Sequence, residues 1–542
     1  MPADEVVTKE TPLAIRDRQL LSEGIVYWLM GLLVIYVIVR GVLQAATKSF
    51  FFDELITMAV ASQPGLRGIW AALVRIADAQ PPLFYWCERV AISLVSNKHI
   101  ALRLPSILAM PWTLICLFLY VKKRSGEFVA LLCALLLLLT SIHRTYSTDA
   151  RPYEMVIACV AFALICYQRL PSSRWAALLG FSLALAQALS YYAIFAMIPF
   201  GLAETVVLMR TKRIRWHVWL ALLFGALPLL MFWPLLWRIR AYYGAHFWSR
   251  YDLQSLPKTY GGFFFTNAAF GTAILAVSIA GVIGARLLAP RTISGEKARG
   301  KSDPIEGTLL LALLALPVIA FAITKFLHGG MADRYVLVTA IGITLAAACV
   351  LSFAGEKGVV LFALFVVSSV VIHEISFWKS VHSFHPENPA TPIEKLVEKA
   401  GYVELPVVVS DGLTYLQVAY YTSPGRAARF VFLADEQKAV EYLGTDTVDK
   451  NIRMISPYTP LHVTDFSEFT SSHAEFLLYA DDPGPGFDWL PYHLSREPWS
   501  LQVLAMEQSR RLYLVSRNEH AAAREGLPGG YLFIEKLKRR EN

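Results

Sequence analysis

Two adjacent carboxylates, Asp53 and Glu54, end the stretch FFFDE (50–54), which follows an apolar segment long enough to cross a bilayer. Charged groups are costly near hydrocarbon, so carboxylates at this depth are either well hydrated or functional. A carboxylate such as Asp53 could act as a general base that takes the proton from an attacking hydroxyl. A hydrated loop end is the alternative interpretation, and the spacing alone leaves both open.

Further charged groups stand near the ends of other apolar segments, namely Asp78, Asp149, Arg151, Lys325, His328, Asp333 and Arg334. Acids and bases gathered at one membrane depth fit group transfer from a phosphate-linked donor. The transition state would resemble an oxocarbenium ion, and a cation would stabilise the charge that develops on the leaving phosphate. Arg334, Lys325 and Arg151 are the candidates for that cation.

Several of these residues also have a purely structural interpretation. Arg151 could pair with Asp149 or extend to the lipid headgroups. Arg334 is a common kind of interface anchor, and His328 beside two glycines is typical of a loop. Aromatic residues at helix ends indicate a belt at the membrane surface, including Tyr191, Tyr192, Trp233 and Trp237.

The composition indicates a polytopic membrane protein. Of the 542 residues, 56% are hydrophobic and 17% are charged, whereas soluble domains carry about 25% charged residues. The net charge of +8 is interpreted as basic cytoplasmic loops, and a nucleic-acid partner is not expected. A Walker loop and a GxGxxG stretch after a strand are both absent from the sequence.

About eleven apolar segments are long enough, or nearly so, to form transmembrane helices. They are 24–45, 105–121, 127–142, 153–168, 175–190, 193–209, 217–237, 272–289, 307–325, 334–354 and 358–377. Lys and Arg are denser in the loops on the side of the N-terminus, which predicts a cytoplasmic N-terminus. The loop 46–104 and everything after residue 377 are then extracytoplasmic.

Residues 83–96, LFYWCERVAISLVS, are apolar but too short to span a bilayer. We expect an amphipathic helix on the outer membrane surface. In this arrangement Glu88 and Arg89 face water. Phe84, Trp86, Ile92 and Val95 then contact lipid or protein.

The sequence divides into a membrane domain, 1–377, and a C-terminal α/β domain, 378–542. Strand-like runs occur at 405–410, 429–434, 474–480 and 512–517. Helical stretches lie between them, at 391–402 and 435–443. This alternation predicts a small α/β domain.

Five elements, taken in order, resemble a known family. They are Asp53-Glu54, PPLFYW (81–86), RLPS (103–106) opening a helix that ends in KKR (122–124), STDARPY (147–153) and Arg334-Tyr335. The order is similar to that in integral-membrane glycosyltransferases of the type C fold (GT-C). Within that fold the chain resembles the bacterial relatives of protein O-mannosyltransferases and the lipid A aminoarabinose transferase.

The resemblance implies an inverting hexosyl- or pentosyltransferase in the bacterial inner membrane. The donor would be a polyprenyl-phosphate-linked sugar, and the acceptor an extracytoplasmic protein, glycan or lipid. It implies that Asp53 is the general base with Glu54 as its partner, and that Arg334 contacts the donor phosphate. It also implies that Arg151 and Tyr153 belong to a motif that lines the same cavity. Asp78 and Asp149 are expected as further acids of that cavity because they lie at the same membrane depth, and Tyr335 follows Arg334 in the late Arg-Tyr pair.

Two departures from the family pattern stand out, Gln80 before the double proline and Asp149 where Glu is frequent. Some type C enzymes use a divalent metal, which Asp53, Asp78 and Asp149 could hold, but the sequence offers no convincing ligand set and no metal is assigned. Two other functions stay open: a transporter or flippase of lipid-linked sugars, and a non-catalytic membrane scaffold. The transporter would require polar residues near mid-bilayer and interrupted helices.

Overall fold

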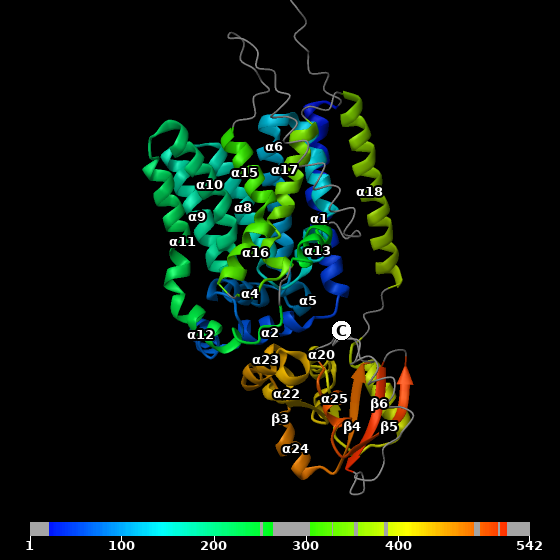
Figure 1. Cartoon of the computed structure of the whole chain (residues 1–542). Coiled ribbons are helices and arrows are strands. Elements are labelled where there is room, and N and C mark those ends of the chain that lie inside the picture. The colour runs from blue at the N-terminus through cyan, green and yellow to red at the C-terminus, as the bar shows by residue number, and fades with distance from the viewer. Residues whose placement is uncertain are drawn as a thin grey trace, which may run out of the picture.

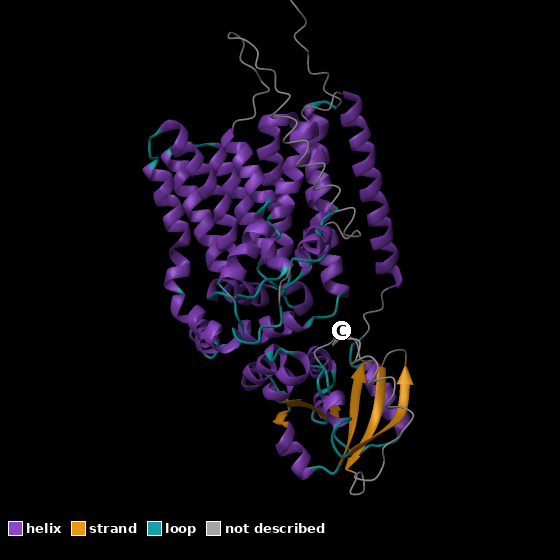
Figure 2. Ribbon diagram, viewed as in Figure 1, coloured by secondary structure: helices purple, strands orange, loops and turns teal. Residues whose placement is uncertain are grey.

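The computed structural model describes residues 21–249, 253–263, 304–327, 329–351, 356–383, 388–481, 488–507 and 510–517. A body of helices occupies one part of the molecule, and a mixed sheet with its helices occupies the other (Figure 1, Figure 2). The described residues are mostly helical. The predicted span 272–289 lies outside the described residues.

The helical body contains long apolar helices and several short ones. Its elements are α1 (Glu23–Thr47), α2 (Phe52–Ala61), α3 (Gly65–Val74), α4 (Pro82–Leu94), α5 (Lys98–Ala101), α6 (Leu104–Leu138), α7 (Ser141–Arg144), η1 (Tyr146–Thr148), α8 (Tyr153–Gln168), α9 (Ser173–Leu189), η2 (Tyr191–Ala193), α10 (Ile194–Thr211), α11 (Trp216–Met231), α12 (Trp233–Tyr243), α13 (Ser255–Gly262), α15 (Pro304–Leu314), α16 (Leu316–Phe326), η3 (Asp333–Val336), α17 (Thr339–Leu351) and α18 (Glu356–Ser383).

Within the described residues, four helices are long and apolar enough to cross a membrane, or up to six if each bent pair counts as one span. The two bent pairs are α11 with α12, at 55°, and α15 with α16, at 60°. The chain is therefore a multi-pass membrane protein. Several predicted spans form helices of only 13 to 17 residues, such as α8, α9 and α17, and the total of eleven stays a prediction.

The predicted break between the second and third spans is present inside α6. Gly126 has φ 82° and ψ 170° there, which interrupts the helical geometry after the basic run KKR. Glycine adopts positive φ without a steric cost, which suits it to this position. The break separates the two apolar segments that the sequence predicts.

Short helices of the first loop lie at the end of the helical body that faces the sheet. Figure 1 shows α2, α4 and α5 there, beside the lower ends of the long helices. The helix α2 begins at Phe52, so Asp53 and Glu54 are in its first turn. Carboxylates are favourable in this position because the helix N-terminus carries partial positive charge.

The prediction that Glu88 and Arg89 face water is wrong. Glu88 is fully buried in α4, on the same helix face as Phe84 and Ala91. Arg89 is half-buried and donates hydrogen bonds to the carbonyls of Ala61 (3.3 Å) and Gln63. The exposed stripe of α4 is instead apolar, formed by Trp86, Val90 and Leu94, because the helix packs its Glu88 face against the protein.

The C-terminal part contains a six-stranded sheet in the order β3-β2-β1-β4-β6-β5. The first four strands in this order are parallel, while β6 pairs antiparallel with β4 and β5. The elements are α19 (Thr391–Ala400), β1 (Val407–Val409), α20 (Gly412–Tyr421), α21 (Pro424–Ala427), β2 (Phe430–Ala434), α22 (Glu436–Leu443), α23 (Thr447–Ile455), η4 (Ser456–Tyr458), β3 (Val463–Asp465), α24 (Phe466–Ser472), β4 (Glu475–Asp481), α25 (Leu490–Leu494), β5 (Trp499–Glu507) and β6 (Arg510–Arg517).

The parallel strands explain the apolar runs seen in the sequence. All three residues of β1 are buried, as expected for a strand covered on both faces by helices. Each of the four strand-like runs overlaps an observed strand, whereas the sequence does not predict β3 and β5. The domain boundary at residues 377 and 378 stays a prediction, since α18 runs to Ser383.

Candidate active site

Asp53 lies between two arginines that come from distant parts of the chain. Its Oδ2 accepts a hydrogen bond from Arg334 Nη1 at 3.0 Å, and Arg151 Nε lies 3.8 Å from the same oxygen. The Asp53 side chain is 19% exposed, so the carboxylate is partly open to a ligand. The structure thus brings together the first loop, the STDARPY segment and the late Arg-Tyr pair.

Glu54 points in a different direction and is almost completely buried. Arg103 donates to both of its carboxylate oxygens, from Nε and from Nη2, each at 2.7 Å. The backbone N–H groups of Phe51 and Ala150 donate to it as well, each at 3.0 Å. Burial opposes ionisation of Glu54, but the hydrogen bonds and charge of Arg103 lower its pKa.

Arg103 is a site residue that the sequence interpretation missed, although it begins the RLPS motif. Its side chain is fully buried and also donates to the carbonyls of Ala45, Lys48 and Ser49 at 2.7–2.9 Å. Arg103 therefore joins the end of α1, the loop before α2 and, through Glu54, the STDARPY segment. This geometry makes Glu54 a residue that holds the loop rather than one that faces a ligand.

Arg151 forms a second buried ion pair beside Asp53. Its Nη1 donates to Asp78 Oδ2 at 2.7 Å and to Thr57 Oγ1 at 3.1 Å. Burial alone would lower the pKa of Arg151, but the carboxylates of Asp78 and Asp53 raise it. Arg151 does not pair with Asp149, which was the structural alternative.

Asp149 forms an ion pair with Lys48, at the end of the segment that leads into FFFDE. Burial raises the pKa of Asp149 in spite of the nearby ammonium group. Lys48 is a second residue that the sequence interpretation did not single out. No distinguishing signal marks it in the sequence, because a lone lysine after a transmembrane segment is common.

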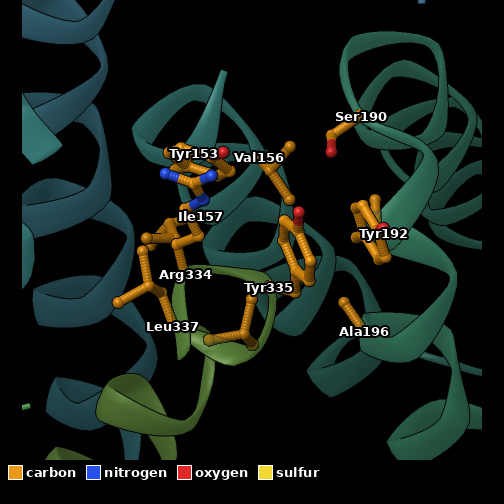
Figure 3. A pocket seen from close by; sticks show the side chains of 11 residues that line it. Tyr153, Val156, Ile157, Ser190, Tyr192, Ala196, Arg334, Tyr335 and Leu337 are labelled. Atoms are coloured by element: carbon orange, nitrogen blue, oxygen red, sulfur yellow. The ribbon is translucent and has the colours of Figure 1, made fainter. Parts of the chain in front are cut away.

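Arg334 lies at the edge of a small, partly open pocket of about 20 Å³. Apolar and aromatic side chains form most of the lining, including Tyr153, Val156, Ile157, Tyr192 and Tyr335 (Figure 3). The rings of Tyr192 and Tyr335 are stacked, with centroids 3.4 Å apart. Tyr192 therefore belongs to the pocket and not to an aromatic belt.

Three aromatic rings surround the Arg334 guanidinium. Its Cζ lies 5.4 Å from the Trp248 ring centroid, 5.9 Å from that of Tyr153 and 6.0 Å from that of Tyr335. Such positions permit cation–π attraction. The Nε atoms of Arg334 and Arg151 are both buried without a hydrogen-bond partner among the described residues, and that of Arg151 is directed toward Asp53, 3.8 Å from its Oδ2.

The remaining candidates lie away from this cluster or outside the described residues. Lys325 is exposed near the end of α16 and forms no ion pair with a described residue. His328 lies outside the described residues. Asp333 accepts a hydrogen bond from Thr259 and does not contact Asp53.

The acids of the site do not fit a metal centre. Asp53 pairs with Arg334 and also lies near Arg151, Asp78 pairs with Arg151, and Asp149 pairs with Lys48. Within the described part of the chain, no group of three or more His, Cys, Asp or Glu side chains is placed to hold a metal ion.

A family model described as dolichyl-phosphate-mannose-protein mannosyltransferase matches residues 79–237. The chain resembles this family. The resemblance predicted from the sequence motifs is thus confirmed over a segment that contains PPLFYW, RLPS and STDARPY. Asp53 and Arg334 lie outside the matched residues. A search of curated proteins found no match to the chain.

Similar solved structures include a bacterial and an archaeal protein. ArnT from Cupriavidus metallidurans bound to undecaprenyl phosphate has 11% identity and a TM-score of 0.40, over 92% of this chain and 99% of ArnT. The oligosaccharyltransferase AglB from Archaeoglobus fulgidus, in complex with an inhibitory peptide and a dolichol-phosphate, has 11% identity and a TM-score of 0.40. That match covers 85% of this chain and 70% of AglB.

Proposed function

We propose that this protein is a membrane glycosyltransferase that moves a sugar from a polyprenyl-phosphate-linked donor to an acceptor hydroxyl outside the cytoplasm. The observation that carries the proposal is the Asp53 carboxylate beside Arg334 and Arg151, next to an apolar pocket. A base, two cations and an apolar surface are the groups that a lipid phosphate sugar requires. The description of the matching family, which names a dolichyl-phosphate-mannose donor, supports the same donor class.

In the proposed reaction Asp53 accepts the proton of the acceptor hydroxyl as its oxygen attacks the anomeric carbon. The bond between that carbon and the phosphate oxygen breaks, and the electron pair leaves with the phosphate. Arg334 and Arg151 stabilise this charge through their guanidinium groups, including the buried Nε–H of Arg334, which has no hydrogen-bond partner among the described residues. Attack opposite to the leaving group inverts the configuration at the anomeric carbon.

The pocket suits the lipid side of such a donor. Its lining is apolar apart from a few hydroxyl groups and Arg334, so an isoprenoid segment could lie against this apolar surface with its phosphate at the guanidinium, provided that the small pocket widens as the donor binds. Glu54 supports the base indirectly, because its bonds to Arg103 and Ala150 fix the start of α2.

The test is transfer of radiolabelled sugar from a panel of polyprenyl-phosphate donors to protein, glycan and lipid acceptors in proteoliposomes. Asp53→Asn keeps the size of the side chain but removes the base, and it is expected to lower the rate by at least about 100-fold. Asp333→Asn is the matched control, since Asp333 lies beside Arg334 but bonds Thr259 instead. Its rate should stay within about twofold of the wild type, as expected for a change outside the reacting groups.

Equal transfer by wild type and Asp53→Asn would refute the assignment of the base. Movement of a labelled lipid-linked sugar across the bilayer without transfer would instead favour the transporter alternative.

A further inference from the structure

The described residues after α18, here called the C-terminal region (388–517), touch the helical body at two places beside the candidate site. One contact involves α20, and the other involves α23. Figure 1 shows both helices on the side of the C-terminal region that faces α2, α4 and α12. The two contacts reach opposite partners of the central ion pair, Asp53 and Arg334.

The first contact holds the backbone of Phe50, three residues before Asp53. The Phe50 N–H donates to the Tyr421 hydroxyl at 2.7 Å, and Gln417 Nε2 donates to the Phe50 carbonyl at 2.7 Å. The Tyr420 ring packs edge-on against the Phe50 ring. Both backbone polar groups of Phe50 are thus satisfied by α20, which fixes the chain immediately before the catalytic turn of α2.

The second contact holds the segment 242–249, which precedes α13. Lys450 Nζ donates to the Tyr242 carbonyl at 2.6 Å, and the Trp248 N–H donates to Thr447 Oγ1 at 3.1 Å. Tyr243 also donates to Asn451 Oδ1 at 2.6 Å. This segment places the Trp248 ring 5.4 Å from the Arg334 guanidinium carbon.

We propose that the C-terminal region is a positioning element of the transfer site. Tyr421 and Gln417 hold Phe50 and thereby align Asp53. Thr447 and Lys450 hold the segment 242–249 and thereby align Trp248 over Arg334. This inference rests on the proposed function. A general base must lie within hydrogen-bond reach of the hydroxyl that it deprotonates. A displacement of about 1 Å in such a group can lower the rate by about 100-fold, so two hydrogen bonds to Phe50 are sufficient to matter.

A matched pair of tyrosines tests the first contact. Tyr421→Phe removes the hydroxyl that accepts the Phe50 N–H. Tyr420→Phe keeps the ring contact with Phe50 and removes a hydroxyl that is not the acceptor of this hydrogen bond. We expect Tyr421→Phe to lower kcat by about tenfold and to leave the donor KM unchanged. The effect is smaller than the loss of about 100-fold that a displacement of about 1 Å can cause, because Gln417 still holds the Phe50 carbonyl. We expect Tyr420→Phe to behave as the wild type, and Gln417→Leu to add to the effect of Tyr421→Phe.

A merely structural role predicts a different result. In that case Tyr421→Phe would reduce the yield of folded protein or its Tm, while kcat per folded molecule would stay at the wild-type value. That outcome would overturn the proposal.

Hydrogen–deuterium exchange of the full-length protein tests the same contact without any substrate. The peptide that covers residues 48–56 should exchange faster in Tyr421→Phe and at the wild-type rate in Tyr420→Phe. Unchanged exchange in Tyr421→Phe would overturn the proposal, and so would faster exchange with unchanged kcat. Full transfer by Asp53→Asn would refute the proposed function, while the exchange result would still decide whether α20 holds Phe50.

Discussion

Removal of the Arg103 side chain is the most direct test of how the site is held together. Arg103→Met keeps much of the apolar volume but leaves Glu54, which is 2% exposed, as a buried carboxylate without its cation. Loss of one partner of a buried, hydrogen-bonded ion pair costs about 3–5 kcal/mol. Two backbone N–H groups still donate to Glu54, so we expect a value near the lower end of this range.

The assay is the free energy of unfolding in mixed micelles, measured by titration with a denaturing detergent. Arg426→Met is the matched control, because Arg426 is 61% exposed and lies 3.4 Å from Glu394. Surface pairs of this kind contribute about 1 kcal/mol or less. The double variant Arg103→Met with Glu54→Gln should lose less than the two single changes together, since no uncompensated charge remains. If Arg103→Met costs no more than the control, the pair does not hold the loop as argued.

Four further changes give independent tests. Arg334→Lys should lower transfer by about 100-fold because one ammonium cannot replace a guanidinium fork, which initial rates with a saturating acceptor will measure. Arg103 lowers the pKa of Glu54, so the ionised carboxylate stabilises the fold above the unfolded pKa of about 4.3. This contribution is lost as the pH falls, so Glu54→Gln should flatten the acid side of the plot of unfolding free energy against pH. Burial and the nearby Glu54 raise the pKa of Glu88, so wild-type stability should fall as pH rises above about 4.3, and Glu88→Gln should reduce that fall. Burial raises the pKa of Asp449 to about 7; this carboxyl should therefore contribute to a decline in stability from about pH 4 to 7, and urea titrations of Asp449→Asn should show a smaller decline than the wild type.

The parts of the site that the sequence predicted are those encoded in ordered motifs. Asp53, Arg151 and Arg334 converge as expected, because their motifs each lie where an apolar segment ends on the same side. The central parallel strands β1, β2 and β4 are also predictable, since buried parallel strands read as continuous apolar runs. Local sequence carries this information without knowledge of the packing.

The parts that the sequence did not predict depend on which face of an element packs inward. Glu88 was placed in water because a charge in a short apolar helix usually marks its solvent face, yet α4 packs that face against the protein. The roles of Arg103 and Trp248 depend on partners 49 and 86 residues away, Glu54 and Arg334. No local pattern specifies such pairings. The number of membrane spans is also difficult to predict from the sequence where helices are short or bent.

The contact between Asp53 and Arg334 has a consequence for the order of events. A carboxylate that is already bonded to a guanidinium is a poor proton acceptor, so the unliganded enzyme would hold its base in a masked form. Arrival of the donor's phosphate at Arg334 would compete for the same donors and unmask the carboxylate. Substrate binding would then follow a compulsory order, with the lipid-linked donor first. Without the donor, Asp53 would stay bonded to Arg334 and would not deprotonate water.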